Sequence, residues 1–110
     1  MANFLLSPHG VDARIPITIA CGYINNQQVW GKLSAGTVLG KITASGKYGP
    51  YDDTATDGRQ TAVGILAEDV DATSSDVGTW MIVHAIVKAS ALIGIDANGK
   101  ADLKGQIIFL

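Results

Sequence analysis

The sequence has a single cysteine, few aromatic residues and little charge. Cys21 has no second cysteine for an internal disulfide bond, and a lone cysteine excludes a metal site built from several cysteines. Charged residues make up 16% of the 110 residues, whereas about 25% is typical of soluble domains. Eight basic and ten acidic residues give a net charge of −2. Because no basic excess is available to neutralise a phosphate backbone, we expect no nucleic-acid partner.

Long apolar runs and a targeting signal are also missing. The longest uninterrupted apolar stretches are roughly half of the about 20 residues that a membrane-spanning helix needs. The amino terminus, MANFLLSPHGVDAR, lacks the basic start and long apolar run of a secretory signal. We therefore expect a single domain that is made in the cytoplasm and has no membrane partner.

What the sequence does contain favours strands. Valine, isoleucine and threonine together contribute 28 residues, and glycine contributes 13. Branched side chains pack well on a pleated sheet, and no helical periodicity lasts beyond two turns. The expected fold is all-β, a small β-barrel or β-tulip-like domain with at most one or two short helices. The candidate strands are Ile15–Ala20, Gln28–Lys32, Thr37–Ser45, Thr61–Ala67, Thr79–Ala91 and Gln106–Leu110.

Turn-forming clusters separate these strands. Asn98-Gly99 predicts a hairpin turn, and Asp57-Gly58 predicts a second tight turn of similar chemistry. Only Lys100–Lys104 and Ser74–Val77 are suited to a short helix. The remaining clusters are Ile24-Asn25-Asn26, Gly46–Asp57 with Pro50, and Asp71–Gly78.

The segment Trp80–Ala91 is almost wholly apolar and is interrupted only by His84 and Lys88. Such a run is expected where both faces of a strand are covered, one by the core and one by something else. Trp30 and Trp80 both fall within candidate strands, and we expect them in the core. His84, in the middle of the strand, is expected to be packed or to lie in an interface.

Residues 1–14 differ from the rest of the chain, residues 15–110, and predict an extended arm. Phe4, Leu5 and Leu6 form an apolar patch, and Pro8 and Gly10 oppose a helix after it. Two interpretations remain open. The segment is either a frayed terminus or a peptide that adds as a strand to the sheet edge of a partner.

No combination of residues predicts catalysis, a cofactor or a metal. The only histidines, His9 and His84, have no adjacent nucleophile that would indicate a catalytic pair. The acidic residues follow strands or lie in polar loops, where they are usually solvated. Asp96-x-Asn98-Gly99 lacks the closing glutamate of a calcium loop, and no phosphate-binding glycine motif is present. We therefore expect a protein that is not an enzyme.

Three segments in the middle of the chain carry a resemblance to a known family. They are AGTVLGKIT (Ala35–Thr43), SGKY (Ser45–Tyr48) and DGRQTAVGILAEDVDAT (Asp57–Thr73). Together, at this spacing, they resemble the head decoration proteins of tailed bacteriophages, the family of the lambda capsid-stabilising protein. The similarity extends more loosely through Trp80–Lys88 and Gly105–Leu110, while GYINNQQVWGK before Leu33 has no counterpart.

The resemblance implies a β-rich subunit that forms homotrimers on the outer surface of the expanded phage head. There it would stabilise the shell at threefold positions, where subunits of the major capsid protein meet. The family's arm joins strands of that capsid protein, a role that falls on Ala2–Arg14 in this chain. The implied contact residues are Asn3, Phe4, Leu5, Leu6, Ser7, Pro8 and His9.

Two alternatives remain. One, within structural proteins, is another virion component, such as a tail or spike domain, although no long inter-subunit loop is visible. The other is a lipoyl or biotinyl carrier barrel, because Gly36–Lys41 is similar to the strand-and-turn pattern of such domains. Neither Lys41 nor Lys47 has the flanking residues of a carrier lysine.

Overall fold

The computed structural model describes Leu5, residues 13–24 and residues 27–110, and β-strands dominate this part of the chain. One 3-10 turn, η1 (Ala89–Ala91), and one short helix, α1 (Ala97–Asp102), lie near the carboxyl end. The strands are β1 (Ala13–Ile19), β2 (Tyr23–Ile24), β3 (Gln27–Gln28), β4 (Lys32–Leu33), β5 (Val38–Lys41), β6 (Tyr48–Pro50), β7 (Ala62–Leu66), β8 (Val70–Asp71), β9 (Val77–Val87) and β10 (Ile107–Phe109).

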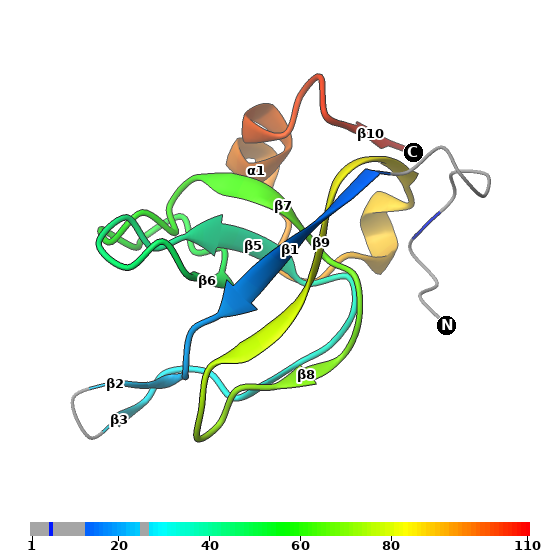
Figure 1. Ribbon diagram of the computed structural model, residues 1–110. Coiled ribbons are helices and arrows are strands. Elements are labelled where there is room, and N and C mark those ends of the chain that lie inside the picture. The colour runs from blue at the N-terminus through cyan, green and yellow to red at the C-terminus, as the bar shows by residue number, and fades with distance from the viewer. Residues whose placement is uncertain (1–4, 6–12, 25–26) are drawn as a thin grey trace.

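Five of these strands close into a barrel (Figure 1). The hydrogen-bonded order is β1-β6-β5-β7-β9, and β1 also pairs with β9, which completes the ring. The β1–β6 pairing is parallel and the other four are antiparallel. β10 adds to β9 in parallel, and the ribbons β2–β3 and β4–β8 lie outside the ring. Closure removes the free edges that an open sheet would expose, and the predicted all-β barrel is confirmed.

A β-bulge in β9 divides the side chains of this strand between two core clusters. Arg14 lies opposite Ile82 but its neighbour Ala13 lies opposite His84, so Val83 is the extra residue. Before the bulge, Met81 packs with the cluster that takes residues from β1, β5, β7 and β9. Its neighbour Ile82 packs with a second cluster on the opposite face. The bulge shifts the alternation by one residue, so that Ala85 and Val87, after it, pack with the same cluster as Ile82.

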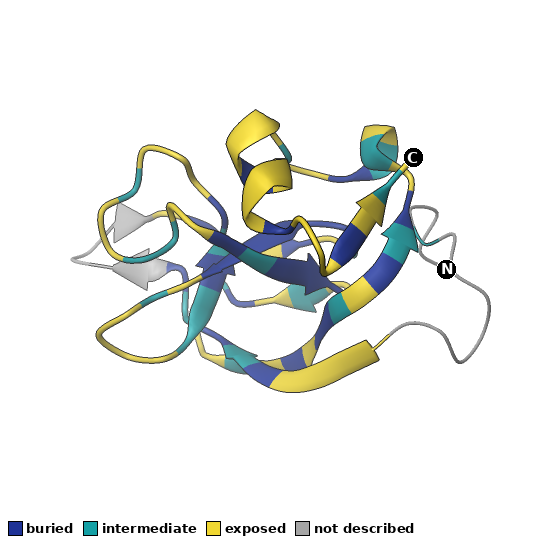
Figure 2. Cartoon of the chain, turned by 90° about the horizontal axis from the view of Figure 1, so that it is seen from above, coloured by how far each residue is buried: buried dark blue, intermediate teal, exposed yellow. Residues whose placement is uncertain are grey.

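The chain's own carboxyl-terminal segment covers the second face. Leu92, Leu103 and Ile107 are buried against Ile65 and Ile82 in one cluster, and Figure 2 shows this segment lying over the barrel strands. The two-sided burial predicted for the long apolar strand is therefore confirmed at Met81 and Ile82, whereas Trp80 and His84 are exposed. What covers its second face is the same chain, not a partner.

Several local predictions were wrong. Asn98-Gly99 lies in the first turn of α1 and not in a hairpin, because the carboxylate of Asp96 accepts a hydrogen bond from the Gly99 backbone N–H at 2.7 Å. That bond is the usual N-cap of a helix. Residues 74–77 are not helical, and β9 already begins at Val77. Residues 100–104 overlap α1 only in their first part.

The strand boundaries also differ from the prediction. The segment Gln28–Lys32 is not one strand, because the backbone N–H groups of Val29 and Trp30 both donate to the Gly22 carbonyl, at 2.7 and 3.3 Å, instead of continuing a strand ladder. The expected turn after Gly46 contains β6. Pro50 is tolerated there because β1 pairs with β6 only at Tyr48, so no partner strand needs its missing N–H.

Candidate interaction surface

Leu5 is the one residue of the expected contact set that the structure describes. It forms an isolated antiparallel bridge with Val87 of β9, is half-buried, and packs against the second core cluster. Ala13 and Arg14, at the end of the expected arm, belong to β1 and pair with β9. The other expected contacts, Asn3, Phe4, Leu6, Ser7, Pro8 and His9, lie outside the described residues.

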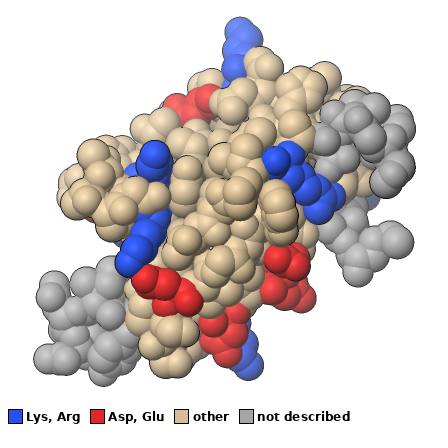
Figure 3. Space-filling model, viewed as in Figure 1, with Lys and Arg blue, Asp and Glu red and all other residues tan. Residues whose placement is uncertain are grey.

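The second feature is an apolar surface on the outer face of β1 and β9. Trp80 is 49% exposed and lies directly opposite Pro16, which is also exposed. Ile15, the preceding residue of β1, is exposed on the other face of the strand, where its register partner is Met81. In Figure 3 the face over β1 shows few charged side chains at its centre and both signs of charge around its rim. Large exposed apolar patches are typical of protein–protein contact sites.

The structure corrects the prediction for Trp80 and confirms it for Trp30. Trp80 shares its face with Ile82, but the covering segment reaches only Ile82 and the residues beyond it, so Trp80 stays outside the core. Trp30 is buried, donates its indole Nε1–H to the Ala20 carbonyl at 2.9 Å, and carries the Arg59 guanidinium over its ring at 4.9 Å.

His84 is exposed where the pairing of β1 with β9 ends. Its register partner is Ala13, which is also exposed. Packing of His84 within the subunit is therefore wrong, and its place in an interface remains a prediction.

Further apolar side chains are exposed near the carboxyl end. Ile108 and Leu110 are 53% and 73% exposed, and Ile108 lies opposite Ile86 in the β9–β10 register. Val87 pairs with Phe109 and also with Leu5. The Leu5 contact and the β10 strand thus meet at the same end of β9.

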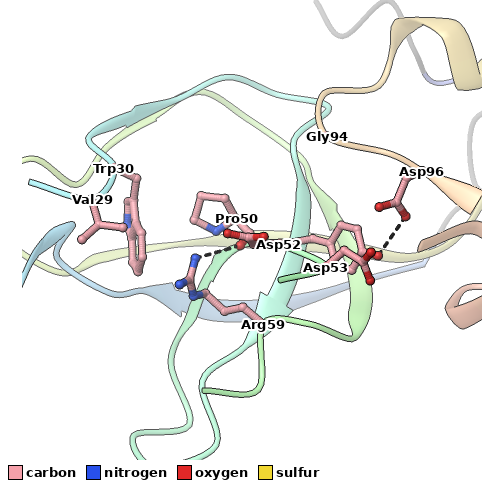
Figure 4. Close-up of a pocket in the computed structure, with 9 residues that line it drawn as sticks. Val29, Trp30, Pro50, Asp52, Asp53, Arg59, Gly94 and Asp96 are labelled. Carbon is pink, nitrogen blue, oxygen red and sulfur yellow. Dashed lines mark hydrogen bonds between the residues drawn. The ribbon is translucent and has the colours of Figure 1, made fainter. Parts of the chain in front are cut away.

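A pocket of about 370 Å³ lies between the loop after β6 and the segment before α1 (Figure 4). Burial of the Tyr51 side chain is the main cause that raises its pKa. The hydrogen bond that the Tyr51 hydroxyl donates to Asp96 at 2.8 Å raises this pKa further. Asp53 accepts a hydrogen bond from the Asn98 side chain at 3.0 Å, and the Asp52 carboxylate accepts two from Thr54. The Tyr51–Asp96 and Asp53–Asn98 bonds join the loop to the start of α1, and the bonds from Thr54 hold the loop itself.

The charged groups around this pocket are held by the chain itself. The Arg59 Nε lies 3.0 Å from an Asp57 oxygen, and the Arg59 Nη1 donates to the Pro50 carbonyl at 3.3 Å. Neither histidine nor cysteine lines the pocket. Within the described ranges, no group of histidine, cysteine or acidic residues is arranged to hold a metal ion. The arrangement supports the fold.

The surroundings of two lysines test whether the protein is a lipoyl or biotinyl carrier barrel. Lys47 forms a 2.5 Å ion pair with Asp76, whose other oxygen accepts the Cys21 backbone N–H at 2.7 Å. The hydrogen bond from Lys47, together with the one from Cys21, lowers the pKa of Asp76. Lys41 lies over the Tyr48 ring at 5.9 Å. Both lysines are thus engaged within the subunit, whereas a carrier lysine projects freely from a hairpin tip.

The described residues thus form a small closed barrel with apolar side chains exposed on its strands, a surface of the kind found in proteins that bind other proteins. No described helix is long and apolar enough to span a membrane. Residues 2–106 match the family described as "Bacteriophage lambda head decoration protein D", and the chain belongs to that family. Its role is the decoration of the phage capsid, which is not an enzymatic function, and its place is on the virion capsid. No curated protein matches the chain.

The family match extends the resemblance found in the sequence. It includes Gly22–Lys32, for which the sequence showed no counterpart, and it begins at residue 2, within the expected arm. The Leu5–Val87 bridge and the Tyr51–Asp96 hydrogen bond were not expected. The first joins residues 82 positions apart and the second spans 45, and no local pattern signals such pairings.

Proposed function

We propose that the protein stabilises the expanded phage head from outside, as homotrimers at threefold positions that join neighbouring subunits of the major capsid protein. Residues 1–14 form the capsid-binding arm and residues 15–110 form the decoration domain. The observation that carries the proposal is the family match, which includes the arm from residue 2 onward. Exposed apolar side chains on β1 and β9 support a subunit that works within an assembly.

The arm binds by adding a strand to an edge of the capsid protein. Backbone hydrogen bonds give such a pairing its affinity, and Phe4, Leu5 and Leu6 add apolar contacts. Ordering the arm costs conformational entropy, so it docks only where a suitable edge is available. Three arms in one trimer act together, and weak single contacts become collectively strong.

Co-sedimentation with expanded, undecorated heads of the parent phage tests this function. The wild-type protein should bind saturably in multiples of three and should not bind unexpanded precursors, in which the edge is differently arranged. A variant lacking residues 2–12 should lose binding. The deletion ends at residue 12 because Ala13 and Arg14 pair with His84 and Ile82 in the barrel.

A point variant refines the experiment. Phe4→Ser with Leu6→Ser should weaken binding to expanded heads, whereas Val29→Ser should not. Val29 is a suitable control because it is 53% exposed and follows β3, at the opposite end of the molecule from β10 (Figure 1). Equal binding to both shells contradicts docking by the arm, and no binding to either shell points to a tail component.

A further inference from the structure

The arm residue Leu5 has a defined position on its own subunit. It bridges Val87 at the end of β9 and contributes a half-buried side chain to the cluster that contains Val87, Leu92 and Ile107. Val87 is fully buried and is paired with β10 on its other side. The described end of β9 therefore already accepts an apolar residue from an antiparallel segment.

The register shows that this contact is not a continuation of β1. Ala13 lies opposite His84, so an unbroken antiparallel strand would place Gly10 opposite Val87. The structure places Leu5 there instead. From Leu5 to Ala13 the chain advances eight residues (13 − 5), whereas β9 advances three from His84 to Val87 (87 − 84). Glycine has no side chain to pack on the cluster, whereas leucine has one. Hydrophobic burial therefore explains why Leu5 lies opposite Val87.

The same leucine has a second role in the proposed function, where it contacts the capsid protein. We infer that these two positions exclude each other: the contact on Val87 is a resting position of the Leu5 side chain, and it competes with docking on the shell. This inference rests on the proposed function. Binding to the expanded head then includes the release of Leu5 from β9.

The contact is suited to such an exchange. It consists of one bridge and one half-buried side chain, and it is separate from the seven register pairs that join β1 to β9. Release of Leu5 leaves those pairs in place. A protein whose binding-competent state is only a fraction of the total has an apparent affinity reduced by that fraction.

A reversible cross-link tests the inference. In a Cys21→Ser background, Leu5→Cys with Val87→Cys places two thiols at opposite positions of an antiparallel pair. The Cα atoms of such pairs are about 4.5–5.5 Å apart, within the range of a disulfide bond. Once oxidised, this variant should bind expanded heads about tenfold or more weakly than its reduced form. Its binding should fall to the level of the variant lacking residues 2–12.

The matched control is Ala13→Cys with His84→Cys in the same background. These residues are also register partners on β1 and β9 and are both exposed, and their cross-link leaves Leu5 free. Its oxidised and reduced forms should bind alike. The single variant Val87→Cys reports the effect of changing a core residue without a cross-link.

Each outcome separates the two proposals. If the wild-type protein fails to bind expanded heads, the proposed function is wrong and the inference fails with it. If the wild-type protein binds, but the oxidised Leu5–Val87 variant binds as well as its reduced form, only the resting position is overturned. The same holds if the control pair forms its disulfide and the Leu5–Val87 pair does not.

Discussion

Replacing Gly40 by alanine tests the close packing on which barrel closure depends. Gly40 lies in β5, opposite Gly49 of β6 and Ala62 of β7. A Cβ atom at this position would lie 2.5 Å from the Arg59 Cα and 2.7 Å from the Arg59 carbonyl oxygen. Both are backbone atoms, so no side-chain rotation relieves the overlap, and either β5 or the Arg59 loop has to move.

The cost follows from what holds that loop. The Arg59 carbonyl accepts the Asp52 backbone N–H at 3.0 Å, and the Arg59 side chain bonds Asp57 and stacks on Trp30. Overpacking of a well-packed site costs about 1–3 kcal/mol. Because moving the loop also disturbs these contacts, we expect a loss of about 2–3 kcal/mol in the free energy of unfolding. That loss corresponds to a decrease of roughly 8–20 °C in Tm for a domain of this size.

Thermal and urea unfolding followed by circular dichroism measure this loss. Gly78→Ala in β9 is the matched control, because a Cβ at Gly78 meets no atom within 4 Å. Its effect should stay within about 0.5 kcal/mol. If the two variants unfold at the same temperature, the close approach of β5 to the Arg59 loop is refuted.

Three further perturbations have defined outcomes. Trp30→Ala should cost about 3–5 kcal/mol of unfolding free energy, whereas Trp80→Ser should cost less than about 0.5 kcal/mol; equal losses in urea unfolding would contradict the burial of Trp30 and the exposure of Trp80. The lowered pKa of Asp76 means that its carboxylate stabilises the fold above about pH 4 and that this contribution is lost as pH falls through the lower folded value. Asp76→Asn should therefore be less stable than wild type by under about 1 kcal/mol at pH 7, with a gap that closes in acid; a constant gap would refute the role of the charge. The raised pKa of Tyr51 means that its neutral form stabilises the fold up to about pH 10 and that stability is lost above it; ultraviolet titration should show a late tyrosine ionisation that Tyr51→Phe abolishes, and its persistence would assign it to another tyrosine.

The barrel itself could be predicted because its signals are local. Branched residues and glycine turns define the strands, and the apolar run of β9 indicates burial on both faces. Which part of the outer face is covered could not be predicted. Ile82 is covered and Trp80 is not because Leu103 and Ile107, more than twenty residues later, return only over the far end of β9.

Two local predictions were wrong because the same residues occur in two kinds of structure. Asn98-Gly99 is typical of a hairpin turn, but Asp96 precedes it at the spacing of a helix N-cap, and the capping bond determines the outcome. Pro50 indicates a turn by composition, yet it is accommodated in β6 because β1 ends its pairing at Tyr48. Both outcomes depend on neighbours that the local pattern does not contain.

The capsid-contact residues remain a prediction from composition, since Leu5 is the one member of that set that the structure describes. Phe4, Leu5 and Leu6 identify an apolar arm from the sequence alone. The contact between Leu5 and Val87 has no such signal, because the β1 register extrapolates to Gly10 at that position. Only the packing of a leucine on the carboxyl-terminal core explains the difference.

Electron cryo-microscopy of expanded heads, with and without added protein, tests the central claim most directly. The account predicts additional density on the outer surface at threefold positions, in three copies for each site, with the amino-terminal segment of each copy running into the capsid protein. Identical reconstructions of the two samples at saturating protein would contradict decoration of the head by this chain.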